Sequence, residues 1–106
     1  MDPSAYKTFT TTRDITYSYY LKAPTGDKPY LFFLHGFPCS SFDWRRQIAF
    51  FTREDYGVVV PDMLGYGNTS KPTDPNAYKS TLICKDLVEV LDNEGIDQTI
   101  VIGHDW

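Results

Sequence analysis

The stretch T-I-V-I-G-H-D-W, residues 99–106, decides how the rest of this chain is interpreted. Residues 99–102 are β-branched and mostly apolar, which predicts a short strand buried on both faces of a parallel sheet. Gly103 then allows the backbone to turn sharply after the strand. This pattern is typical of the first half of a nucleophile elbow, in which a strand turns into a helix and holds one side chain above the turn. Asp105 occupies the nucleophile position.

Length and composition allow one globular domain. The chain has 106 residues, of which 42% are hydrophobic and 16% aromatic. A formal net charge of −4 argues against nucleic acid or an anionic membrane as a partner. Cys39 and Cys84 have no metal-ligand spacing, so we expect free thiols in a reducing compartment and no metal site. The sequence shows no signal peptide and no apolar run near the ~18 residues of a membrane helix, so we expect a soluble, cytoplasmic protein.

Hydrophobic periodicity and turn residues predict strands that alternate with helices after an initial pair of strands. In the first half we expect two antiparallel strands within residues 9–23 with a turn at Arg13-Asp14, a central strand at 30–34, and a helix that begins after Ser40 or Ser41 and ends at Gly57. In the second half we expect a strand at 58–60 closed by Pro61, a polar loop at 62–76, a helix at 78–93 stopped by Gly95, and the strand at 99–102.

The helix expected at residues 78–93 has one apolar face. The positions predicted to face the core are Ile83, Leu87, Val90 and Leu91. The acidic positions predicted to face solvent are Asp86, Glu89 and Asp92.

This order of elements indicates an α/β fold. Alternating strands and helices form parallel strands joined by right-handed crossovers, with helices on both faces of an open sheet. Ligand sites in such sheets lie at the carboxyl ends of the strands. The loop that starts at His35, the loop that starts at Asp62 and the turn at Asp105 are therefore expected to converge on one site.

Three blocks of sequence together resemble the α/β-hydrolases of the epoxide hydrolase branch. They are H-G-F-P at 35–38, D-M-L-G-Y-G-N-T-S-K-P at 62–72 and G-H-D-W at 103–106. The resemblance covers essentially the whole chain and corresponds to the amino-terminal third of such an enzyme. It implies a mostly parallel sheet with an antiparallel first pair and helices on both faces. Residues 1–106 would form an incomplete core domain that ends before the cap and the distal catalytic residues.

The resemblance assigns the chemistry to Asp105. Its carboxylate would attack an epoxide carbon and form an ester, which water then hydrolyses to release a diol. The backbone amides of Phe37 and Trp106 would stabilise the oxyanion that develops during hydrolysis. Taken alone, an Asp directly after a buried strand is more commonly a helix N-cap, and the two other sequence blocks favour the nucleophile role.

The remaining residues of the motifs are expected to support this site. His35, Gly36 and Pro38 belong to the oxyanion loop, and Gly103 belongs to the elbow. We expect His35 to brace its loop rather than act as a base. His104 neighbours the nucleophile on the turn, so its side chain is expected to point away from Asp105.

Two positions bear on the substrate. Haloalkane dehalogenases typically carry Asn where this chain has Phe37, and a phenylalanine side chain cannot donate a hydrogen bond to a halide. Fluoroacetate dehalogenases usually carry Arg where this chain has Trp106. Both differences favour an epoxide and water as the reactants, with no cofactor. The alternatives are a haloalkane dehalogenase-like fragment and a non-catalytic binding protein with the hydrolase fold.

The resemblance also implies missing parts. The family's base histidine, its acid partner and the cap tyrosines that protonate the epoxide oxygen are expected beyond Trp106. We therefore expect the chain by itself to be inactive.

Overall fold

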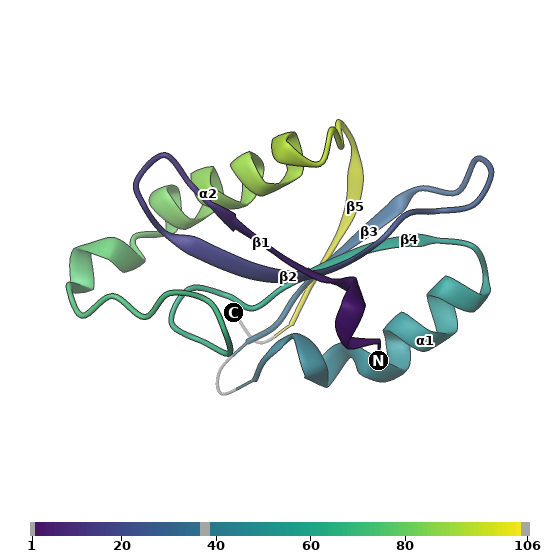
Figure 1. Ribbon diagram of the computed structural model, residues 1–106, viewed down its shortest axis with the longest axis horizontal. Coiled ribbons are helices and arrows are strands. Elements are labelled where there is room, and N and C mark those ends of the chain that lie inside the picture. Colours follow the sequence, from purple (N-terminus) through teal and green to yellow (C-terminus); the bar gives the residue numbers. More distant parts are fainter. Residues whose placement is uncertain (1, 37–38, 105–106) are drawn as a thin grey trace.

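A mixed β-sheet with helices on both faces forms the centre of the molecule (Figure 1). The computed structural model describes residues 2–36 and 39–104. Its strands are β1 (Tyr6–Thr10), β2 (Thr16–Lys22), β3 (Tyr30–Leu34), β4 (Gly57–Pro61) and β5 (Thr99–Gly103). Its α-helices are α1 (Arg45–Arg53) and α2 (Ser80–Asn93), and its short 3₁₀ helices are η1 (Pro3–Ala5), η2 (Ser41–Trp44) and η3 (Pro75–Tyr78).

The strands lie in the order β1-β2-β4-β3-β5. The pairs β1–β2 and β2–β4 are antiparallel, whereas β4, β3 and β5 are parallel to one another. Phe32 in β3 lies opposite Val59 in β4 and Val101 in β5. The predicted α/β class, with its antiparallel first pair, is confirmed.

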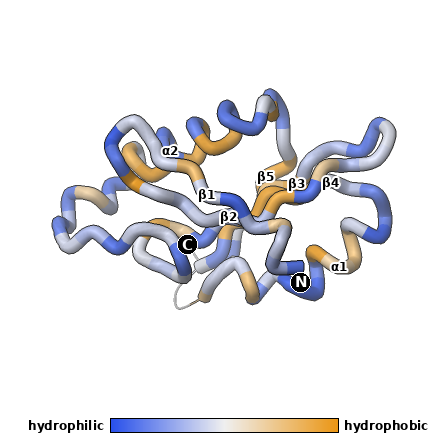
Figure 2. Tube along the Cα trace, viewed as in Figure 1, coloured by the Kyte–Doolittle hydropathy of each residue, from blue (hydrophilic) through white to orange (hydrophobic). Residues whose placement is uncertain are grey.

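Each face of the sheet carries its own hydrophobic core because strand side chains alternate between the two faces. The core under α2 includes Tyr17, Tyr19, Phe32, Val59, Leu87 and Val90. The core under α1 includes Tyr20, Leu31, Phe33, Ile48, Val58 and Val60. Hydrophobic positions gather along the central strands in Figure 2. In the described part of the chain, no helix has both the length and the apolar character needed to cross a membrane.

The prediction that residues 99–102 are buried on both faces is wrong. Ile100 is 51% exposed and Val101 is 61% exposed. The cause is the position of β5, which is the outermost strand beside β3 in the described sheet. The apolar pattern correctly indicated a strand parallel to its neighbour, but burial of a strand also depends on what packs on its other side.

The predicted helix ends need correction at two places. α1 ends at Arg53, and Asp55 rather than Gly57 takes the left-handed conformation after it, with φ +71°. Gly57 instead begins β4, where a Cβ would lie 2.6 Å from Cδ of Pro24. The helix expected from residue 78 begins at Ser80, because Lys79 is extended and separates it from η3.

Asp86 is buried, which contradicts the prediction that it faces solvent. The turn between β1 and β2 lies against this side of α2. Arg13 in that turn donates from Nε to Oδ1 of Asp86 at 2.9 Å and from Nη2 to Oδ2 at 2.5 Å. The hydroxyl of Tyr17 also donates to Oδ2, at 2.7 Å. Burial, reinforced by the bond to this carboxylate, raises the pKa of Tyr17 far above its usual range.

Glu89 and Asp92 differ from each other. Glu89 is half-buried, and its Oε1 accepts the backbone N–H of Thr12 at 2.8 Å, so it also binds the β1–β2 turn. Asp92 is exposed, as predicted.

Candidate active site at the carboxyl ends of the strands

The ends of the three parallel strands meet at one edge of the sheet, as predicted. β3 leads into His35, β4 leads into Asp62 and β5 leads into His104. The amide of His104 donates to the carbonyl of Leu34 at 3.1 Å, which joins the ends of β5 and β3. The predicted nucleophile Asp105 and the predicted oxyanion-hole residues Phe37 and Trp106 lie outside the described residues, as does Pro38.

His35 is a buried connector between two loops. It is 2% exposed, and its Nε2 accepts the amide hydrogen of Met63 at 2.9 Å. Because Met63 can only donate here, Nε2 carries no proton and Nδ1 donates to the carbonyl of Gly36 at 2.9 Å. The ring also packs edge-on against Tyr66, with centroids 5.2 Å apart. Both nitrogens are therefore occupied within the protein, which agrees with a bracing role.

Gly36 closes a turn at the start of the same loop. Its carbonyl accepts the amide hydrogen of Cys39 at 2.9 Å as well as the His35 ring hydrogen. Ser40 then caps η2, and the Asp43 carboxylate accepts the Ser40 amide at 2.8 Å to complete a capping box. The predicted helix start at Ser40 or Ser41 is confirmed, with a 3₁₀ turn preceding α1.

Asp62 is the site residue whose role the sequence did not reveal. It is 3% exposed, and both carboxylate oxygens accept backbone amides: Oδ1 from Ser41 at 2.8 Å and Oδ2 from Asn68 at 3.1 Å. Its own amide donates to the carbonyl of Ser18 at 2.8 Å, and its carbonyl accepts the hydroxyl of Thr69 at 2.6 Å. A signal was available, since an Asp directly after a buried strand and before closely spaced glycines is suited to binding loop amides.

Gly67 lets the loop return to Asp62. It has φ +52°, and a Cβ built there would lie 2.4 Å from Oδ2 of Asp62. A side chain would collide with the carboxylate and would also be strained by the left-handed backbone. This loop also buries Met63 and Leu64, so residues 62–76 are not simply a polar surface loop.

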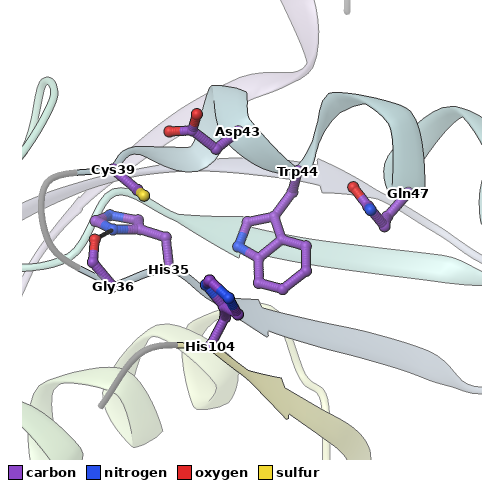
Figure 3. Close-up of a pocket in the computed structure, with 7 residues that line it drawn as sticks. All are labelled: His35, Gly36, Cys39, Asp43, Trp44, Gln47 and His104. Carbon is purple, nitrogen blue, oxygen red and sulfur yellow. Dashed lines mark hydrogen bonds between the residues drawn. The ribbon is translucent and has the colours of Figure 1, made fainter.

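A cavity of about 330 Å³ opens beside these loops (Figure 3). Its lining residues are His35, Gly36, Cys39, Asp43, Trp44, Gln47 and His104. The exposed His104 ring is perpendicular to the Trp44 indole, with centroids 6.4 Å apart. The Trp44 Nε1 is buried and has no hydrogen-bond partner among the described residues. Cys39 is a free thiol.

The described residues do not form a metal centre. Within residues 2–36 and 39–104, no three His, Cys, Asp or Glu side chains lie close enough to hold a metal ion.

Comparison with known proteins identifies the family. The family model for the alpha/beta hydrolase fold matches residues 29–106. "Epoxide hydrolase 2" of Siraitia grosvenorii is 43% identical over 84 residues, which cover 79% of this chain and 27% of that protein. "Bifunctional epoxide hydrolase 2" of Mus musculus is 44% identical over 81 residues, covering 76% of this chain and 15% of that protein.

Solved structures agree with this result. A Vigna radiata epoxide hydrolase mutant superposes with a TM-score of 0.86 and 34% identity, over 95% of this chain and 30% of that one. Epoxide hydrolase A from Mycobacterium thermoresistibile gives a TM-score of 0.84 and 33% identity, over 95% of this chain and 31% of that one. This chain spans about a quarter of the Siraitia relative's length. The strand order, the loops at the strand ends and the family match together show that the chain belongs to the α/β-hydrolase fold family.

Proposed function

We propose that this chain supplies the amino-terminal part of the core domain of an epoxide hydrolase, which opens epoxides to diols through an ester on Asp105. The observation that carries the proposal is the similarity to proteins named epoxide hydrolases, at 43–44% identity over 76–79% of this chain. The fixed His35–Gly36 loop at the strand ends supports it, because an oxyanion site needs donors that are positioned before the reaction.

The reaction has two steps. In the first, a carboxylate oxygen of Asp105 bonds to an epoxide carbon, the carbon–oxygen bond of the ring breaks, and the ring oxygen takes a proton. In the second, water attacks the carbonyl carbon of Asp105, the bond from that carbon to the alkyl oxygen breaks, and the diol leaves. The amides of Phe37 and Trp106 are proposed to donate to the oxyanion of the second step.

The general base is assigned outside this chain. His35 is an unsuitable base because its Nε2 lone pair already accepts the Met63 amide. We therefore assign the water-activating histidine, its acid partner and the tyrosines that protonate the epoxide oxygen to other sequence of the complete enzyme. The 106-residue chain alone is then expected to give no turnover.

A chimera tests the proposal. Residues 1–106 would be joined to the part of the Siraitia grosvenorii protein that follows the matched segment, and the product assayed with styrene oxide. In a single turnover in ¹⁸O-labelled water, the first diol should be unlabelled, because its new oxygen comes from Asp105. Asp105→Ala should abolish turnover, whereas Asp97→Ala, which removes an exposed carboxylate, should leave it within about two-fold.

Four results would contradict the proposal. A folded chimera that opens no epoxide would remove the assigned activity, and release of chloride from a 1-chloroalkane would favour a haloalkane dehalogenase. A labelled diol in the first turnover would exclude the ester route. Repeated turnover by the 106-residue chain would show that the base does not lie outside it.

A further inference from the structure

Two adjacent residues, Asp62 and Met63, bind the chain on both sides of residues 37–38. The Met63 amide donates to His35 on the amino-terminal side at 2.9 Å. The Asp62 carboxylate accepts the Ser41 amide on the carboxyl-terminal side at 2.8 Å. The two ends of the loop at 35–41 are thus attached to one dipeptide.

Asp62 is itself held in place from several directions. Its second carboxylate oxygen accepts the Asn68 amide, and its main chain is bonded to Ser18 and Thr69, which are both buried. The backbone of Gly67 packs against the carboxylate without room for a Cβ. A buried carboxylate with both oxygens occupied by amides is a rigid reference point, because moving it would leave buried polar groups unpaired.

The bond to Ser41 also has a local purpose. Ser41 is the first residue of η2, and the first amides of a helix have no partner within the helix. The Ser40 hydroxyl oxygen accepts the Phe42 amide hydrogen at 3.3 Å, and the Asp62 carboxylate accepts the Ser41 amide hydrogen. Loss of Asp62 would therefore release the Ser41 end of the loop, and the neighbouring bond from the Cys39 amide to the Gly36 carbonyl would then open more often.

We propose that Asp62 is a positioning residue for the oxyanion loop of this site. It holds the Ser41 end of the loop, while His35 holds the Gly36 end, and together they set the separation between the two ends. In this proposal Asp62 acts through the loop and is assigned no contact with a reacting atom. The functional part of this inference rests on the proposed epoxide hydrolase activity, whereas the positioning part does not.

This role has a kinetic consequence. Oxyanion donors act on ester hydrolysis, since ester formation develops no charge on the Asp105 carbonyl oxygen that a donor would need to stabilise. Displacing the loop should slow ester hydrolysis about ten-fold or more and change ester formation much less. The ester should accumulate, and kcat should fall more than kcat/KM.

Amide exchange of the 106-residue chain, followed by NMR, tests the positioning without any substrate. In Asp62→Asn, one amide hydrogen must face the NH₂ group instead of an oxygen. We expect at least ten-fold faster exchange at Ser41 or Asn68 and at Cys39, with no change at Val59 in β4. Asp74→Asn is the matched control, because Asp74 is an exposed carboxylate that also accepts a backbone amide, that of Asn76 at 3.0 Å.

A second pair of variants keeps the test decisive if Asp62→Asn fails to fold. Ser41→Pro removes the donor while keeping the carboxylate, and the preceding Ser40 has φ −149° and ψ 179°, which a following proline accepts. Ser41→Ala loses the same hydroxyl, which bonds to Tyr6 at 2.6 Å, but retains the amide. Cys39 exchange should accelerate in Ser41→Pro and remain slow in Ser41→Ala.

The outcomes separate the two proposals. Unchanged Cys39 exchange in both Asp62→Asn and Ser41→Pro, or equal acceleration at Cys39 and Val59, would overturn the positioning role whatever the activity. If exchange changes as expected and the wild-type chimera opens no epoxide, the proposed activity is wrong and the positioning role of Asp62 is supported. If the wild-type chimera is active and its Asp62→Asn variant hydrolyses the ester at the wild-type rate, the kinetic role fails.

Discussion

The Nε2 atom of His35 lies 2.9 Å from the amide nitrogen of Met63, so one hydrogen bond joins two loops that are 28 residues apart in the sequence. The bond is buried, and the same ring donates to Gly36 through its other nitrogen. A single imidazole thus links the loops that follow β3 and β4.

Removing this ring should be costly. His35→Ala would leave the buried Met63 amide without an acceptor, which lowers the free energy of unfolding by about 2 kcal/mol. His35→Gln should recover part of this loss, because its side-chain oxygen can accept the same amide. His104→Ala, at an exposed position, should change stability by less than about 0.5 kcal/mol. Urea unfolding of the three variants measures these differences, and a His35→Ala chain as stable as wild type would refute the connecting role.

Gly67 and Gly26 form a matched pair for testing the approach of the loop to Asp62. Both have positive φ, +52° and +64°, but a Cβ on Gly26 would meet nothing within 4 Å. Gly26→Ala should therefore cost about 1 kcal/mol from backbone strain alone. Gly67→Ala should cost about 2 kcal/mol more, because its methyl group displaces the Asp62 carboxylate. Equal losses in thermal or urea unfolding would contradict the close packing.

The pair of Asp86 and Arg13 should contribute strongly to stability. Asp86 is 1% exposed, so Asp86→Ala leaves Arg13 and Tyr17 without their acceptor and should cost about 3 kcal/mol. Asp92→Ala, at an exposed position on the same helix, should stay within about 0.5 kcal/mol. A double-mutant cycle with Arg13→Ala should give a coupling energy of about 1 kcal/mol or more. Additive losses would show that the two side chains stabilise the fold independently.

The hydrogen bond from Tyr19 to Glu94 should make stability depend on pH. Burial, with the bond to Glu94, raises the pKa of Tyr19 to about 12 from 10.0. A folded-state pKa above the unfolded value means that the stabilisation is complete below pH ~10 and is lost as the pH rises toward 12. The free energy of unfolding of wild type and of Tyr19→Phe, measured in urea, should differ by about 1 kcal/mol at pH 7, and this difference should narrow between about pH 10 and 12. A constant gap would contradict the shift.

Glu94, the other partner in this contact, makes stability depend on pH in the acid range, where stability is lost as the pH falls. Burial alone would raise the pKa of Glu94, but the hydrogen bonds from Tyr19 and Lys7 together outweigh it, and the pKa is lowered. A lowered folded-state pKa gives stabilisation that is present above the ordinary value of 4.5 and is lost as the pH falls below it.

The exposed strand β5 should promote self-association of the 106-residue chain. Val101 is 61% exposed on this outermost described strand. Val101→Lys should slow association, measured by light scattering, because a lysine on an edge strand opposes pairing with another strand. Val88→Lys makes the same change at a 54% exposed site on α2 and should have a much smaller effect. Similar effects from both variants would indicate general charge repulsion instead.

Much of the fold follows from local sequence. Three local patterns each indicate their element without reference to the rest of the chain. They are the apolar run at 30–34, the apolar face of residues 83–91, and Gly95, which follows α2 with φ +69°. The H-G-F-P and G-H-D-W blocks similarly point to the site and to its family. Asp105, Phe37 and Trp106 remain predictions from those blocks.

The tertiary structure decided what these elements touch. Asp86 has the spacing of a solvent-facing residue, yet it is buried. The reason is that Arg13 and Tyr17, which lie about 70 positions earlier in the β1–β2 hairpin, bind its carboxylate. Asp62 looks like one polar residue in a polar loop, yet its carboxylate binds amides from two separate segments. Ile100 looks like a core residue, yet it is exposed because β5 is outermost. The physical reason is the same in each case: periodicity and turn chemistry depend on neighbours along the chain, whereas burial and hydrogen bonding depend on residues that only folding brings together.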